Sequence, residues 1–165
     1  MAYIELISRD QIKPRVLVDD DIVEELGKYK WVWLSGYANT NIRQPDGTYK
    51  GVRMHRMILS AADDEICDHI NRNRLDNRRS NLRIATFQQN AWNRTKVSGY
   101  SDYLGVASYQ YYGEHPRWVA CIVMSGERVE LGTYDDQEEA AYIRDQFAMQ
   151  LQGEYASLNF EYAEE

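Results

Sequence analysis

The sequence of 165 residues has few cysteines and no long apolar segment. Cys67 and Cys121 form no Cys-x-x-Cys pair and are too few for a disulfide framework. No run of about 18 apolar residues is present, which excludes a membrane-spanning helix and a membrane partner. The stretch MAYIELISRD lacks the apolar core of a secretion signal. These absences favour a reduced, cytoplasmic location.

The chain also lacks an overall positive charge, and its net charge of −7 argues against a nucleic-acid partner. The charge is unevenly distributed, however. Residues 1–95 carry 15 lysines and arginines against 13 aspartates and glutamates, whereas residues 96–165 carry 4 against 13. Within residues 66–96 the count is seven basic against two acidic side chains. A basic segment therefore lies inside an acidic protein, and a solvated charged loop is the plain alternative for it.

The chain is long enough for one substantial domain or two small ones, and its pattern is that of an α+β protein. Residues 1–54 have the short alternating patterns of a β-rich region that leads into the rest. Short strands are predicted at 3–7, 15–18, 31–34, 37–42 and 52–54. A short helix is expected after residues 19–21, ending near Gly27.

Residues 102–160 predict a three-stranded antiparallel sheet packed on one helix. The strands are expected at 104–109, 118–124 and 128–134, and Asp135 or Asp136 can cap the helix that follows. Ala140, Ile143, Phe147 and Leu151 recur at helical spacing, which predicts that they form its buried face. Gly153 supplies a stop. Residues 97–101 lie between the two regions as a short linker that contains glycine and serine.

The segment CDHINRNRLDNRRSNLRIATFQQN, which starts at Cys67, holds the residues suited to catalysis. Asp68 and His69 are adjacent at the end of a predicted strand, and residues 82–85 predict a second strand. Thr86 and Gln89 have capping-box spacing, so a helix is expected to begin at Phe87. A histidine can serve as a base near neutral pH, and a carboxylate offers a hard oxygen ligand.

Residues 55–93 resemble HNH endonucleases of the ββα-metal fold, in particular those found among phage homing enzymes. The resemblance rests on Asp68-His69, Asn81-Leu82-Arg83 and Asn90 at fixed spacing. It implies that His69 is the general base, that Asn81 orients the loop, and that Asp68 and Asn90 bind one divalent cation. Both expected ligands are oxygens, which favours Mg²⁺ or Mn²⁺ over Zn²⁺.

Several arginines are candidates for binding the phosphates of double-stranded DNA, because the planar guanidinium suits phosphate geometry. In the nuclease region these are Arg72, Arg74, Arg83 and Arg94. Solvation at the surface, or pairing with Asp76, is the alternative for each. His55 is expected to be mainly structural, and Asn73 and Asn77 are expected to be turn residues.

Residues 103–160 resemble the plant ethylene-response-factor (APETALA-type) DNA-binding domain. The matching residues are Leu104-Gly105-Val106, Arg117-Trp118-Val119-Ala120, Leu131-Gly132-Thr133-Tyr134, Glu138-Glu139-Ala140-Ala141 and Leu158-Asn159-Phe160. The resemblance implies DNA reading from the sheet, through Arg117 and Arg128. Glu130 and the apolar second strand depart from the basic residues usual in that family.

Together these patterns predict a nuclease domain at 1–96, with its β-rich lead-in at 1–54 and its core at 55–96, and a DNA-binding-like domain at 102–165. The expected activity is metal-dependent hydrolysis of DNA phosphodiester bonds, as a nick or a double-strand cut. Two alternatives stay open. One is a DNA-binding regulator that does not cut, and the other is an interaction module whose acidic C-terminal domain binds a protein. The oligomeric state is open as well.

Overall fold

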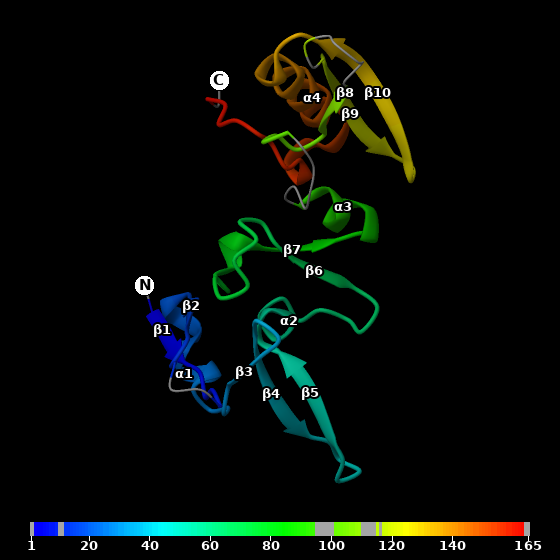
Figure 1. The fold of residues 1–165 in the computed structure, drawn as a ribbon. Coiled ribbons are helices and arrows are strands. Elements are labelled where there is room, and N and C mark those ends of the chain that lie inside the picture. The colour runs from blue at the N-terminus through cyan, green and yellow to red at the C-terminus, as the bar shows by residue number, and fades with distance from the viewer. Residues whose placement is uncertain (1, 10–11, 95–100, 110–114, 116, 164–165) are drawn as a thin grey trace. The chain divides into compact units, whose positions relative to one another are not determined.

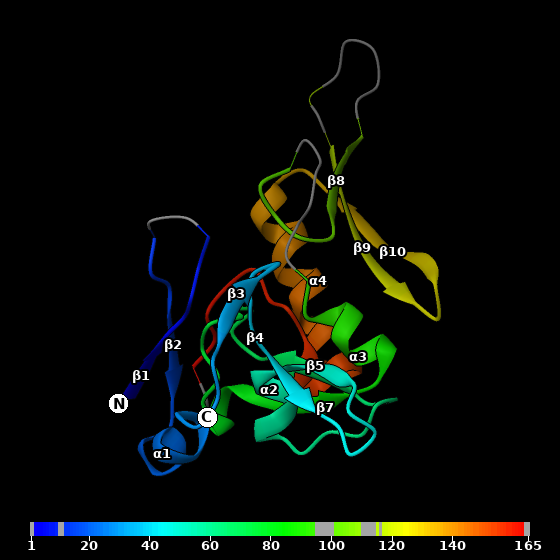
Figure 2. The same cartoon turned by 90° about the horizontal axis from the view of Figure 1, so that it is seen from below.

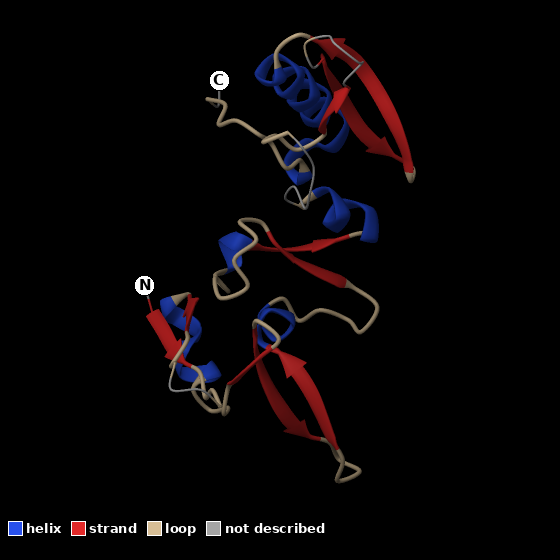
Figure 3. Ribbon diagram, in the orientation of Figure 1, coloured by secondary structure: helices blue, strands red, loops and turns tan. Residues whose placement is uncertain are grey.

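The computed structural model describes residues 2–9, 12–94, 101–109, 115 and 117–163. The chain divides into two compact units, Met1–Asn90 and Ala91–Glu165. Small antiparallel sheets and few helices make up both, which is compatible with the expected α+β class (Figure 3).

The first unit consists of short strands and helices, several of which lie close to their predicted positions. In chain order they are β1 (Ala2–Glu5), β2 (Arg15–Val18), η1 (Asp20–Ile22), α1 (Val23–Leu26), β3 (Val32–Leu34), β4 (Tyr37–Arg43), β5 (Tyr49–Arg53), α2 (Met54–Ile58), β6 (Ile66–His69), η2 (Arg79–Asn81), β7 (Leu82–Ala85) and α3 (Phe87–Trp92). Met54 begins α2 and does not end the preceding strand as predicted. β1 pairs with β2, β6 pairs with β7, and β3, β4 and β5 form a three-stranded sheet (Figures 1 and 2).

One hydrophobic core joins these elements. It is formed by Leu6, Val16, Val18, Leu26, Trp31, Ala38 and Met54, with Leu75 packed against it. Trp31 is 2% exposed, and its indole N–H donates to the Leu26 carbonyl at 2.8 Å. Because Leu75 belongs to the loop between β6 and β7, the N-terminal strands and that loop share one core.

The second unit contains the predicted sheet and helix. Its elements are β8 (Val106–Tyr109), β9 (Arg117–Met124), β10 (Glu127–Tyr134), α4 (Gln137–Gln152) and η3 (Gly153–Tyr155), with β9 in the middle of the sheet. The Asp136 side chain accepts hydrogen bonds from the Glu138 and Glu139 amides and so starts α4, which ends at Gly153 with φ of 54°. Of the predicted linker, residues 97–100 lie outside the described residues, and Ser101 is buried.

The buried face of α4 matches the predicted one only in part, because Ala140 is buried as predicted and two of the other residues are not. Phe147 and Leu151 are 42% and 44% exposed, while Arg144 and Asp145 are buried. The reason lies in the C-terminal segment, whose amides at Asn159 and Phe160 donate to the Asp145 carboxylate at 2.6 and 3.1 Å. A helix face that binds backbone amides has to be polar, so the apolar repeat indicated only part of the buried face.

Candidate active site

The β6–β7 hairpin positions the predicted pair of Asp68 and His69. Asp68 is opposite Arg83 and His69 is opposite Leu82 in the antiparallel register. Both side chains are buried, at 7% and 5% exposure. Neighbouring residues of a strand project to opposite sides, and these two accordingly meet different partners.

The His69 ring is held by an asparagine that the sequence indicated only as a turn residue. Its Nε2 lies 2.7 Å from Asn77 Oδ1. A carbonyl oxygen only accepts hydrogen bonds, so Nε2 carries the proton and the lone pair lies on Nδ1. Asn77 is 1% exposed. No local signal separates a buried asparagine from a turn asparagine in the segment DNRRS, which is why sequence reasoning missed its contact.

Burial also sets the charge state of His69. It lowers the pKa of the ring below its usual value, although the Asn77 hydrogen bond and the Asp68 and Asp76 charges act the other way. The His55 ring lies edge-on to the His69 ring, with 4.9 Å between centroids. Burial and the nearby cationic groups lower the pKa of His55 to about 3. Both rings are therefore neutral at neutral pH, and a neutral imidazole is the form that can accept a proton.

Asn81 connects the two ends of the loop between β6 and β7. Its Oδ1 accepts from the Asn71 amide at 2.9 Å, and its Nδ2 donates to the Asp76 carbonyl at 2.7 Å. The Ile70 amide donates to the Asn81 backbone carbonyl at 2.9 Å. One side chain thus holds both ends of the segment that carries Asn77.

The N-terminal strands hold the same loop from outside. The Leu17 amide donates to the Leu75 carbonyl at 2.7 Å, and the Asn77 amide donates to the Leu17 carbonyl at 2.8 Å. The Asp19 carboxylate accepts from the Arg79 amide at 2.9 Å. These contacts are mostly between backbones, so no side-chain pattern pointed to them.

Asp68 forms a close ion pair with Arg83. Arg83 Nη2 lies 2.9 Å and Nε lies 3.0 Å from Asp68 Oδ2, and the side chains are 10% and 8% exposed. The guanidinium predicted to contact phosphate is thus bound to the carboxylate predicted to contact metal. A buried carboxylate requires such a partner, because an unpaired buried charge is costly.

Asn90 lies on α3, which begins where β7 ends. The predicted capping box is confirmed: the Thr86 amide donates to Gln89 Oε1 at 2.8 Å, and the Gln89 amide donates to Thr86 Oγ1 at 3.2 Å. The Asn90 amide donates to the Thr86 carbonyl at 3.0 Å, and its side chain is half-buried. The hydrogen bonds described above link Asp68, His69 and Asn81 to the hairpin and its loop, whereas Asn90 is positioned by the helix.

The other predicted arginines lie at the surface. Arg72 and Arg74 are exposed on the loop, Arg72 with φ of 63°, and the Arg74 guanidinium lies 4.6 Å from the centre of the Tyr37 ring. Arg94 follows α3 and is exposed. Arg117 and Arg128 are on the second sheet.

No group of three or more His, Cys, Asp or Glu side chains gathers as a metal cluster in the described part of the chain. The predicted pair of Asp68 and Asn90 is a different donor set, one carboxylate and one amide. Among the described residues, no helix is long and apolar enough to cross a membrane.

Comparison with known proteins identifies the class. Residues 54–92, which span α2 to α3, match the family model described as HNH endonuclease. A relative from Acanthamoeba polyphaga mimivirus, named as an uncharacterized HNH endonuclease, is 32% identical over 141 residues, covering 81% of this chain and 68% of its own. The chain belongs to the HNH endonuclease family. It is therefore an enzyme, a nuclease that acts on DNA.

Proposed function

We propose that this protein is a metal-dependent DNA endonuclease of the homing type found among phages. It nicks or cuts double-stranded DNA, and β6, β7 and α3 form its catalytic site. The observation that carries the proposal is the state of His69. The ring is buried, neutral and fixed by Asn77, and it directly follows Asp68 in the strand.

In the proposed reaction His69 accepts a proton from water at Nδ1, and the water oxygen attacks phosphorus while the bond to the leaving oxygen breaks. Asn77 keeps the ring in the tautomer that this step needs. Asn81 positions the loop that carries Asn77, and its two hydrogen bonds across that loop support the role.

Asp68 and Asn90 are the proposed metal-binding side chains. HNH nucleases generally use a divalent metal ion, and two oxygen donors fit Mg²⁺ or Mn²⁺. The ion would supply neutralisation of the charge on the phosphate and the leaving oxygen. The ion pair with Arg83 supports the fit, because it holds the Asp68 carboxylate in a fixed position beside β7.

The DNA contacts proposed for the arginines fall into two groups. Arg72 and Arg74 are exposed beside the catalytic loop and suit phosphate binding. Arg83 first serves to hold the Asp68 carboxylate. Arg94, Arg117 and Arg128 remain predicted DNA contacts, the last two through the APETALA-type resemblance. The acidic second unit could equally bind a protein partner.

Cleavage of supercoiled plasmid tests the proposal. Wild-type protein is expected to nick or linearise it with Mg²⁺ or Mn²⁺ and to leave it intact with EDTA. His69→Ala should slow cleavage by about 10²- to 10⁴-fold, the usual contribution of a general base. His115→Ala, exposed in the second unit, is the matched control.

A second measurement separates metal binding from activity. Mn²⁺ should raise the melting temperature of wild-type and His69→Ala protein, and Asp68→Asn should weaken that shift. Cleavage without metal, or full activity of His69→Ala, would contradict the mechanism. Tight DNA binding with no cleavage under any condition would favour the regulator.

A further inference from the structure

The hairpin of β4 and β5 has one buried face and one open face. Directly paired residues of antiparallel strands project to the same side. Ala38 and Thr40 on one side are 1% and 6% exposed, whereas Tyr49 on the other side is 69% exposed. The open face consists of Tyr37, Asn39, Asn41, Arg43, Tyr49 and Arg53.

The open face is cationic, and no acidic residue occurs anywhere in β3, β4 or β5. Arg43 and Arg53 supply its charge. The third basic residue of these strands, Lys50, alternates to the other side and pairs with Asp63 at 2.8 Å. In a chain of net charge −7 this is an unusual surface. The turn between β4 and β5 carries one carboxylate, Asp46, whose Oδ1 accepts from the Thr48 amide and hydroxyl at 2.9 and 2.6 Å. Arginine, amide and tyrosine side chains are the chemistry that binds phosphates and base edges.

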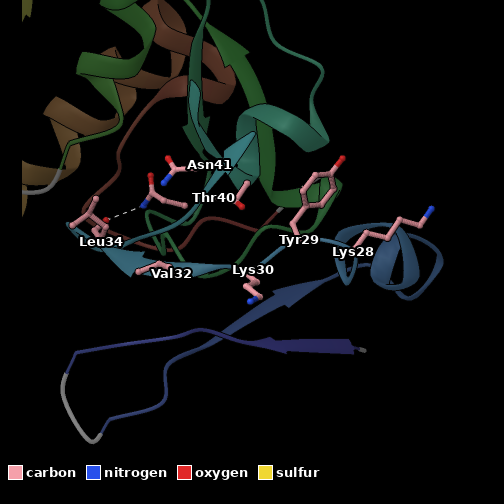
Figure 4. Close-up of a pocket in the computed structure, with 8 residues that line it drawn as sticks. Lys28, Tyr29, Lys30, Val32, Leu34, Thr40 and Asn41 are labelled. Carbon is pink, nitrogen blue, oxygen red and sulfur yellow. Dashed lines mark hydrogen bonds between the residues drawn. The ribbon is translucent and has the colours of Figure 1, made fainter. Parts of the chain in front are cut away.

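A groove beside β3 extends this surface. It has a volume of about 460 Å³ and is lined by Lys28, Lys30, Asn39 and Asn41, among others (Figure 4). The two lysines add positive charge along its edge. The Asn39 amide is engaged in the β3–β4 turn, donating to the Leu34 and Tyr37 carbonyls at 3.1 and 2.9 Å. Asn41 is exposed and lies opposite Gly51, which has no side chain to cover it.

Tyr37 links the open face to the catalytic residues. Its ring centroid is 6.2 Å from that of His69 and 5.3 Å from that of His55. The guanidinium groups of Arg53 and Arg74 lie 4.5 and 4.6 Å from the centre of the same ring. Arg74 comes from the catalytic loop and passes over Gly36, where a Cβ would lie 3.4 Å from its Nη1. A phosphate bound by these two arginines would be near His69.

From these observations we propose that the open face of the β4–β5 hairpin binds the major groove of double-stranded DNA and presents the strand to be cut to His69. The hairpin projects from its unit as a two-stranded ribbon (Figure 1). Such a ribbon fits a major groove, which is about 12 Å wide. Arg43 and Arg53 contact phosphates, and Asn41 hydrogen-bonds a base edge, with adenine as the natural partner of an amide.

This DNA-binding proposal rests on the proposed nuclease function in one respect, because it takes the bound duplex to be the substrate. It is tested without hydrolysis, by binding of a fluorescein-labelled 30-base-pair duplex of mixed sequence to the full chain in EDTA. The test variant is Arg43→Ala with Arg53→Ala. The matched control is Arg9→Ala with Lys13→Ala, which removes two exposed basic side chains between β1 and β2.

The test variant should bind about tenfold more weakly or worse, and its plot of log affinity against log salt should be shallower by about 2, because two phosphate contacts are lost. The control should change affinity by less than about twofold. Equal losses in both variants, or a loss only in the control, would overturn the proposal. A wild-type protein that binds in this way but cuts no plasmid would refute the proposed function alone.

The proposed hydrogen bond of Asn41 with a base edge is tested separately. Ends produced on plasmid by wild-type and Asn41→Ala protein are mapped by sequencing, with Asn73→Ala as the control. Asn41→Ala should lose the preference for one base at a fixed distance from the cut, with discrimination between bases reduced by about 5- to 150-fold. An unchanged base preference would contradict the assignment.

Discussion

The two three-stranded antiparallel sheets of this protein differ in what surrounds their arginines. On β3-β4-β5, Arg53 lies over the Tyr37 ring and no carboxylate occurs in the strands. On β8-β9-β10, Arg117 lies 3.2 Å from Asp135, and Arg128 lies 3.9 Å from Glu130. The same architecture thus carries an open cationic surface in one unit and a neutralised surface in the other. The local charge, more than the shape of the sheet, favours the first sheet as the proposed DNA-binding surface.

The buried ionisable side chains of the two units also differ in what they do. Asp145 of the second unit is 0% exposed and accepts from Arg144, Asn159, Phe160 and Tyr162. Burial and this carboxylate raise the pKa of Tyr162 to about 12. In the first unit, burial instead keeps two histidines neutral. The buried network of the second unit stabilises its fold, while that of the first unit holds His69 in the neutral form that the proposed mechanism requires.

The largest expected effect falls on the structural network. Asp145→Ala leaves the Arg144 guanidinium buried without its carboxylate, which should lower the free energy of unfolding by about 3–5 kcal/mol. Urea unfolding followed by circular dichroism measures the change. Asp135→Ala, whose side chain is 90% exposed, should stay within about 0.5 kcal/mol. Similar losses of unfolding free energy in both variants would contradict the structural role of the buried Asp145 carboxylate.

A smaller effect is expected from Asn77, which is buried and orients the proposed general base His69. Asn77→Ala should reduce plasmid cleavage by about 10- to 100-fold, the range for side chains that orient reactive groups. The loss should appear in kcat more than in KM, and the pH dependence of kcat should shift because the His69 tautomer is no longer fixed. Asn73→Ala, exposed on the same loop, should retain wild-type rates. A change in KM alone would speak against this positioning role.

The buried histidines predict an acid-sensitive first unit. His55 has a pKa of about 3 when folded against 6.5 when unfolded, so the unfolded chain binds the proton first as pH falls. Stability is full above pH 6.5 and decreases as the pH falls toward 3. Between pH 7.5 and 5.5 His55 should account for about 1 kcal/mol of that loss.

His55→Gln should remove this part of the pH dependence, measured by urea unfolding at both pH values. His115→Gln, exposed in the second unit, should leave it unchanged. A steeper decline in His55→Gln would show that the sign of the shift is wrong.

The smallest effect tests the two sheets directly. Glu130→Gln with Asp135→Asn frees Arg128 and Arg117 from their carboxylates and makes the second sheet more like the first. Duplex binding in EDTA should strengthen by about two- to fivefold and depend more steeply on salt. Asp63→Asn, which frees Lys50 on the covered side of the first sheet, should have less effect. The reverse order would show that the second sheet is the main DNA surface.

Local sequence alone determined the elements that depend on neighbouring residues. The capping box at Thr86 and Gln89, the Asp136 cap and the β6–β7 strands form where short-range patterns predicted them. Family resemblance added the site, and the HNH endonuclease match confirmed the class.

Contacts between distant segments were decided only by the tertiary structure. The bond from Asn77 to His69, the ion pair of Arg83 with Asp68 and the anchoring of the loop by Leu17 involve polar or backbone groups without a periodic signature. The apolar repeat of α4 missed Asp145 for the same reason, because this buried carboxylate binds amides of the C-terminal segment. Hydrophobic periodicity predicts where apolar side chains can be buried, but polar partners are chosen by which backbones the fold brings together.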